Sequence, residues 1–232
     1  MQQQYPWIAQ QKWEDILFIH TPFSPQFLQG YVPLPFTIDT YNGKAWLTLV
    51  LFRATNSRPR FFPSWLSYPD MYQMNLRTYV TFGGESGVYF FSIHSDSLAA
   101  TIGGNVVALP FQRAPMTIRK EGHSFHFTGS RLARKRTGEL QIAYQPDTTS
   151  FTPQKDSLSH FLTERYSILK KQGNRIVKGT IGHGNWLLQE ALLSKQHCEN
   201  IPFCFTPETF GHYSAQQHTV LYPFEKAGIF NG

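Results

Sequence analysis

The 232-residue chain is poor in cysteine and in charge, and it has no long hydrophobic run. No stretch approaches the roughly 18 apolar residues that would span a bilayer. The N-terminal "MQQQYPWIAQQKWED" lacks the apolar core of a signal peptide. We therefore expect a cytoplasmic protein without a membrane partner.

The two cysteines, Cys198 and Cys204, give little support for a metal site. Their spacing is too wide for the C-x2-4-C pairs of structural zinc sites, and no second pair is present. The nine histidines form no metal signature either, so no metal is expected. Free thiols are the default for a cytoplasmic chain, although a single bridge stays open.

Standard catalytic motifs are also missing. The chain has no P-loop and no G-x-G-x-x-G motif, so no cofactor is expected. "GGESG" is not a nucleophile elbow, because Ser86 lies one residue away from the central position of G-x-S-x-G. His183, in the glycine-flanked "GHGNW", is the histidine that stands out most as a candidate.

Aromatic residues are abundant at 16% of the chain, which favours a β-rich fold because these side chains suit pleated surfaces. We expect one domain spanning residues 1–232. Turn signals at Asn42-Gly43 and in "GGESG" predict two hairpins. Residues 53–70, rich in proline and aromatics, are expected to form a long loop. Short helices are expected in "SPQFLQG", "SDSLAATIGG" and "DSLSHFLTERY", and a last strand in "HTVLYPF".

The densest basic cluster is "RLARKR", residues 131–136. It could bind phosphate and so mark a nucleic-acid protein, or it could be the solvated end of a hairpin. The remaining Lys and Arg residues are scattered, and we expect no nucleic-acid partner.

Two polar segments have open interpretations. In the expected strand "MNLRTYV", Asn75, Arg77 and Tyr79 share one face, which either meets water or lines a pocket. The opposite face, with Leu76 and Val80, is apolar enough to pack. In "FLTERY", Glu164 is either a structural ion-pair or capping residue or, if buried, a general base.

Five stretches in order resemble one family: "MNLRTYV", "GVYFFSI", "LPFQRAPM", "SLSHFLTERY" and "GHGNW". They are similar to the YqjF-like bacterial family, domain of unknown function 2071, from about Trp13 to Phe224. That resemblance implies an acetoacetate decarboxylase-like fold, which is a closed antiparallel β-barrel with two or three short helices here. It leaves a homo-oligomer open, since related decarboxylases assemble.

The resemblance also bears on chemistry. Acetoacetate decarboxylases form a Schiff base through a lysine whose pKa is lowered by a neighbouring cation. The corresponding positions hold Phe111 and Gln112, neither of which can form an imine. The two acids of the decarboxylase align with Arg53 and with the neighbourhood of Asn75 and Arg77. The resemblance thus implies a cavity where guanidinium groups hold an anion.

We therefore expect a small-molecule ligand, anionic or aromatic, inside the barrel. A different enzyme, a lyase or hydrolase of small carboxylates, is the alternative, with Arg77 holding the substrate and Glu164 or a tyrosine moving a proton. The expected ligand-binding residues are Arg53, Asn75, Arg77, Tyr79, Phe111, Gln112, Arg113 and Glu164.

Overall fold

The computed structural model describes residues 6–106, 109–130, 138–199 and 205–230. The strands are β1 (Ala9–Phe23), β2 (Thr37–Ile38), β3 (Thr40–Tyr41), β4 (Lys44–Pro59), β5 (Met71–Phe82), β6 (Glu85–Ser95), β7 (Phe111–Arg113), β8 (Met116–Glu121), β9 (Ser124–Ser130), β10 (Glu139–Phe151), β11 (Ser167–Gln172), β12 (Arg175–His183), β13 (Leu188–Glu199), β14 (Phe210–Leu221) and β15 (Glu225–Ile229). The helices are α1 (Pro25–Gln29), the 3-10 turn η1 (Ser64–Leu66), α2 (Leu98–Val106) and α3 (Leu158–Thr163). The predicted β-rich class with short helices is confirmed.

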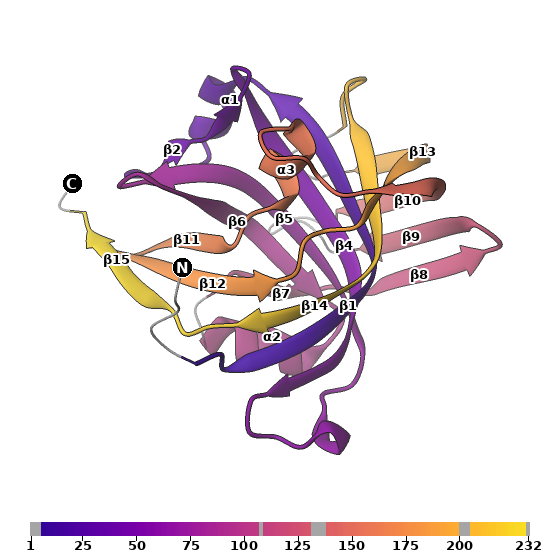
Figure 1. Cartoon of the computed structure of the whole chain (residues 1–232), viewed down its shortest axis with the longest axis horizontal. Coiled ribbons are helices and arrows are strands. Elements are labelled where there is room, and N and C mark those ends of the chain that lie inside the picture. The colour runs from indigo at the N-terminus through magenta and orange to yellow at the C-terminus, as the bar shows by residue number, and fades with distance from the viewer. Residues whose placement is uncertain (1–5, 107–108, 131–137, 200–204, 231–232) are drawn as a thin grey trace.

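The strands form one sheet in the order β15-β12-β11-β6-β5-β4-β1-β14-β13-β10-β9-β8, with β2, β3 and β7 attached beside this path. Pairing is mostly antiparallel, with parallel pairs where β6 meets β7 and β11. β12 also pairs with β14 over Ile181–His183. The sheet is strongly curved, and α3 and α2 lie toward opposite ends of its central strands (Figure 1).

The two predicted hairpins are confirmed. Asn42 and Gly43 connect β3 to β4 with φ of 50° and 75°, a conformation that asparagine and glycine adopt most readily. Gly83 and Gly84 connect β5 to β6 in the same way. Two of the expected short helices, α1 and α3, are present, and the hydroxyl groups of Ser24 and Ser157 cap them by accepting backbone N–H groups of the first turn.

Three expectations need correction. Residues 53–59 continue β4 instead of opening a loop, since they pair with the start of β1. The α2 helix runs past Gly103 to Val106, and its cap is Ser97, whose hydroxyl accepts from the N–H of Ala100. The chain also adds β15 after β14, paired with β12.

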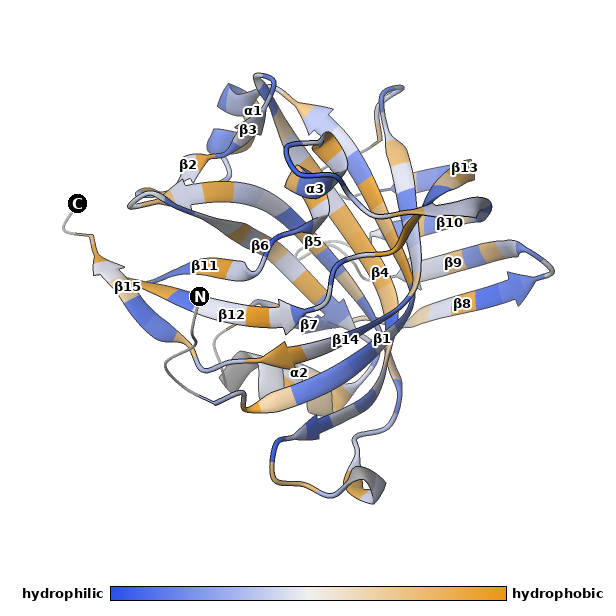
Figure 2. Ribbon diagram, in the orientation of Figure 1, coloured by the Kyte–Doolittle hydropathy of each residue, from blue (hydrophilic) through white to orange (hydrophobic). Residues whose placement is uncertain are grey.

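Alternation along the central strands buries apolar residues on both faces of the sheet, in three clusters. On β4, Leu47, Leu49 and Leu51 belong to the larger core, which extends to strands β8, β9 and β10. Val50 belongs to a second core on the other face of the strand. Hydrophobic residues are concentrated on the central strands, whereas the outer end of β8 is hydrophilic (Figure 2). None of the helices in the described ranges is long and apolar enough to cross a membrane.

Candidate functional site

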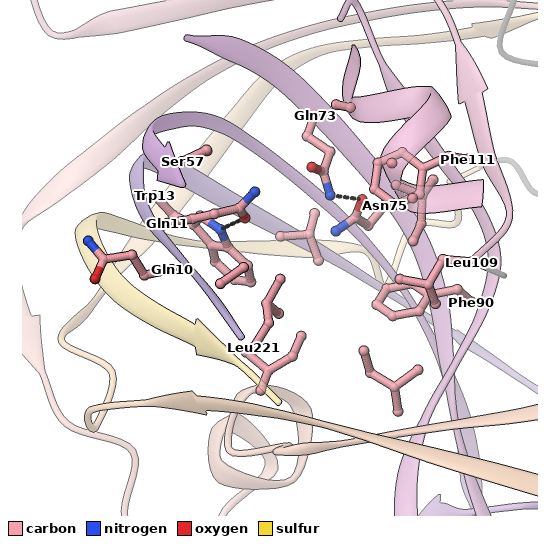
Figure 3. A pocket seen from close by; sticks show the side chains of 18 of the residues that line it. Gln10, Gln11, Trp13, Ser57, Gln73, Asn75, Phe90, Leu109, Phe111 and Leu221 are labelled. Carbon is pink, nitrogen blue, oxygen red and sulfur yellow. Dashed lines mark hydrogen bonds between the residues drawn. The ribbon is translucent and has the colours of Figure 1, made fainter. Parts of the chain in front are cut away.

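A pocket of about 310 Å³ lies on the second face, the one that carries Val50. Strands β1, β4, β5, β6, β11, β12 and β14 contribute to its wall, and α2 covers part of it. Figure 3 shows Gln11 and Trp13 on one side, and Phe90, Leu109 and Phe111 on the other. Residues from both ends of the chain therefore meet around one space.

Strand β5 supplies a polar row to this pocket. Met71, Gln73, Asn75 and Arg77 all line it, at every second position of the strand. The amide of Gln73 donates to Asn75 Oδ1 at 2.9 Å (Figure 3). The sequence left open whether this face meets water or a pocket, and the structure places Asn75 and Arg77 at a pocket. Leu76 and Val80, on the other face, pack in the larger core.

Arg77 is the feature that distinguishes this row. Its Nη2 donates to the backbone oxygen of Leu162 at 3.1 Å, and its buried Nε has no hydrogen-bond partner among the described residues. No carboxylate in those ranges forms an ion pair with it, whereas the neighbouring Arg165 is paired with Asp39 at 3.0 Å. The guanidinium of Arg77 therefore has hydrogen-bond donors available at the pocket.

Aromatic and aliphatic groups form most of the remaining wall. Behind this wall, the guanidinium carbon of Arg77 lies 5.7 Å from the ring centre of the buried Phe18, close enough for a cation–π contact. Phe111 packs so tightly on α2 that a Cβ atom on Gly104 would lie 2.1 Å from its ring. Glycine at that position is therefore required for Phe111 to reach the pocket.

Two further side chains, Tyr166 and His183, lie at the Arg77 end. Their rings stack at 4.4 Å, and His183 also lies 5.1 Å from the ring of Trp186. Burial lowers the pKa of His183 below its usual value, against the smaller opposing effects of the hydrogen bond to Gly184 O and of the Glu164 charge. The charge of Arg77 adds a small lowering of this pKa. The imidazole is therefore neutral at pH 7.

Glu164 holds this corner together. One carboxylate oxygen accepts the backbone N–H of Trp186 at 3.2 Å, and the other accepts the hydroxyl of Tyr166. Burial, followed by this hydrogen bond, raises the pKa of Tyr166. Glu164 caps the C-terminus of α3 and does not line the pocket. Of its two interpretations, the geometry favours the structural one.

Beside the pocket, under α3, lies a buried polar chain of four residues. Tyr79 OH donates to Leu162 O at 2.7 Å and bonds to Thr48 Oγ1 at 2.7 Å. Thr48 contacts His20 Nδ1 at 2.9 Å, and His20 Nε2 contacts His212 Nδ1 at 3.2 Å. Because Leu162 O can only accept a hydrogen bond, the direction of every bond is set. Tyr79 donates to Leu162 O, Thr48 to Tyr79, His20 to Thr48, and His212 to His20. We call Tyr79, Thr48, His20 and His212 the sealed chain.

Several of the residues predicted to bind a ligand lie outside the pocket. Arg53 lies on the face of β4 opposite Val50, where it is exposed and its Nη2 contacts Asp70 at 2.5 Å. Strand alternation in β7 turns Phe111 into the pocket but not Gln112, and Arg113 lines a separate depression with Asp96. Tyr79 belongs to the sealed chain. Of the eight predicted residues, the pocket contains Asn75, Arg77 and Phe111.

The pocket also contains residues that the sequence did not identify as one group. Gln73 could have been found from alternation alone, because it shares a face with Asn75. Leu221 could not, since strand pairing brings it beside Ala9 and Ile181. Trp186 could not either, since it lies in the connection between β12 and β13. The lining includes no lysine from the described ranges, and no three metal-ligating side chains cluster there or elsewhere in them. Residues 131–136 and Cys204 lie outside the described residues.

Comparisons with known proteins place this geometry in context. A model of the family DUF2071, described as an uncharacterised conserved protein, matches residues 10–222. Protein YqjF of Bacillus subtilis strain 168, itself uncharacterised, is 36% identical over 225 residues, which cover 95% of this chain and 93% of that protein.

Solved structures with a similar fold are enzymes. The enduracididine biosynthesis enzyme MppR complexed with pyruvate matches with a TM-score of 0.70 at 10% identity, over 98% of this chain and 93% of its own. Acetoacetate decarboxylase from Legionella pneumophila matches with a TM-score of 0.66 at 13% identity, over 99% and 91%. At such identities the likeness shows the fold alone, and the predicted acetoacetate decarboxylase-like fold is confirmed to that extent.

Proposed function

We propose that this chain, which belongs to the DUF2071 family, binds a small anionic or aromatic molecule in its pocket, with Arg77 as the group that holds the anion. The observation that carries the proposal is the guanidinium of Arg77, which has one hydrogen-bonded nitrogen and no ion pair among the described residues. A charge in such a position is costly unless a counter-charge arrives.

A carboxylate is the ligand group that fits best. Guanidinium groups bind carboxylates through two parallel hydrogen bonds and keep their proton. The aromatic wall supplies apolar contact for the rest of the molecule. We also propose that the strands around the pocket form a closed barrel, a reading supported by the additional pairing of β12 with β14.

The proposed binding does not use an imine. A Schiff base needs a lysine amine at the pocket. The described lining residues include arginine, histidine and tyrosine but no lysine, which supports a site of different chemistry.

Thermal unfolding tests the proposal directly. Benzoate, 3-phenylpropanoate and pyruvate should raise the melting temperature, whereas the matching amides should not. Arg77→Met should abolish the shift. Arg53→Met, an exposed arginine on the adjacent strand β4, is the matched control and should retain it. Equal shifts from acids and amides, or full shifts in Arg77→Met, would refute the role of Arg77.

The corner beyond Arg77 supports a second candidate, a lyase or hydrolase acting on small carboxylates. There the neutral His183 stacks on Tyr166, whose hydroxyl bonds to Glu164, so groups able to move a proton lie beside the proposed anion site. Turnover of a bound carboxylate that disappears in both Arg77→Ala and Tyr166→Phe, with binding kept in Tyr166→Phe, would support this candidate. Unchanged turnover in Tyr166→Phe would exclude that tyrosine from the reaction.

A further inference from the structure

We infer that the pocket selects an elongated monocarboxylate, with its carboxylate at Arg77 and an apolar tail extending along β5. This inference rests on the proposed function and adds the shape of the ligand to it. It depends on three observations: the extent of the lining along one strand, the difference between the two ends, and the character of the wall between them.

The pocket extends along β5. Its lining runs along β5 from Met71 to Arg77, a distance of about 20 Å at the rise of a strand. The cavity of about 310 Å³ therefore extends along this strand, and we call it the channel. Its volume falls within the range of pockets that hold small organic ligands.

The two ends of the channel differ in charge. At one end the buried Nε of Arg77 has no hydrogen-bond partner among the residues that the structure describes. At the other end Arg58 is also cationic, but its nitrogens have partners. Its Nη1 donates to Phe62 O at 3.0 Å, and its Nε and Nη2 donate to the side-chain oxygen of Gln10 at 3.0 and 3.1 Å, with that amide in the orientation that satisfies both side chains. Ile8 and Tyr68, 43% and 49% exposed, lie beside it. A carboxylate is therefore drawn to the Arg77 end.

The wall between the ends accepts a hydrocarbon tail. Val50, Phe90, Ile93 and Phe111 line this part of the channel. The amides of Gln73 and Asn75 bond to each other, which lowers the cost of placing methylene groups beside them. On the α2 side the lining residues Ala99, Ala100 and Gly103 are small, and a Cβ atom added to Gly103 would meet nothing within 4 Å.

The test is titration calorimetry of the whole chain with straight-chain carboxylates from acetate to dodecanoate, below their micelle concentrations. The dissociation constant should fall about fourfold for each added methylene, the factor that burial of one such group gives. The gain should end within this series, at the chain length whose tail fills the channel. Octanamide should bind far more weakly than octanoate.

Ala100→Leu places three more carbons against the middle of the channel and should move the end of the gain to a shorter chain. Leu98→Ala, on the exposed face of the same helix, is the matched control and should leave the series unchanged.

The outcomes separate this inference from the proposed function. If acetate and benzoate bind through Arg77 but longer chains gain nothing, the elongated ligand is wrong and the proposed function stands. If no carboxylate binds, both are wrong. A chain-length gain that Ala100→Leu does not shorten would show that the tail lies outside the channel, which would also overturn the inference.

Discussion

Arg77 and Tyr79 lie two residues apart on the same face of β5, yet their surroundings are opposite. In the sealed chain, the hydroxyl of Tyr79 has both Thr48 and Leu162 as partners, and the chain continues to His20 and His212. Arg77 shares Leu162 O but keeps a buried Nε without a partner in the described ranges. A polar group inside the sheet is thus structural when its hydrogen-bonding atoms all have partners, and it is available to a ligand when some of them do not.

This contrast has an energetic meaning. A buried polar group with its partners in place stabilises the fold modestly, and losing one partner costs the desolvation of the other. A buried charge without partners does not stabilise the folded state. We therefore expect substitutions in the sealed chain to lower stability, and substitutions of Arg77 to lower ligand binding.

The largest expected effect is a loss of stability in acid that depends on the sealed chain. Burial lowers the pKa of His212 to about 4, and burial, then the charges of His212 and Arg77, lower the pKa of His20 well below its usual value. Below about pH 6.5 these histidines bind protons in the unfolded chain but not in the folded chain. The free energy of unfolding should fall by up to about 1.4 kcal/mol per pH unit for each histidine as pH drops toward 4.

Urea unfolding at a series of pH values measures this slope. His212→Asn should flatten it, while His126→Asn, an exposed histidine on β9, should not. An equal slope in the wild type and in His212→Asn would mean that the sealed chain does not contribute to the pH dependence of stability.

Tyr79→Phe should have the next largest effect. It removes the hydroxyl that joins Thr48 to Leu162 O, and we expect a loss of about 1–3 kcal/mol in the free energy of unfolding. Tyr41→Phe removes an exposed hydrogen bond to Asp156 and should cost less. Equal losses in the two variants would contradict the structural role of the sealed chain.

Arg77→Met should change the free energy of unfolding by less than about 1 kcal/mol, because the guanidinium is only partly satisfied and methionine suits an apolar wall. Chemical denaturation checks this value. A loss larger than that of Tyr79→Phe would show that Arg77 is structural and would remove the contrast with Tyr79.

After imine trapping we expect the smallest effect, no change in the protein mass, because no covalent adduct forms. Incubation with pyruvate or acetoacetate and borohydride should leave the protein mass unchanged, because none of the described lining residues is a lysine. Mass spectrometry detects the adduct, with a Schiff-base decarboxylase as the positive control. A trapped adduct would overturn the proposal of a site without imine chemistry.

Local chemistry made part of this structure predictable. The hairpin at Asn42-Gly43 and the caps at Ser24 and Ser157 follow from conformational preferences of a few adjacent residues. Alternation similarly placed Asn75 with Arg77 on one face of β5.

Long-range pairing was not predictable in the same way. Residues 53–59 form a strand because the start of β1 pairs with them, and His183 reaches the pocket because β12 pairs with β14. The position of Arg53 depended on which face of β4 meets the pocket, and alternation alone does not choose between the two faces. Tyr79 has the same orientation as Arg77, but α3 covers it, and the Tyr79 hydroxyl donates to Leu162 O of that helix.

The most direct test of the central claim is the side-chain Nε–H signal of Arg77 in a nitrogen–proton NMR spectrum, assigned by its loss in Arg77→Lys. Titration with octanoate should shift this signal strongly and in a saturable manner, while the signal of Arg53 stays fixed. Saturable shifts elsewhere in the pocket with an unmoved Arg77 signal would show that a ligand binds without this guanidinium, and the claim that Arg77 holds the anion would be wrong.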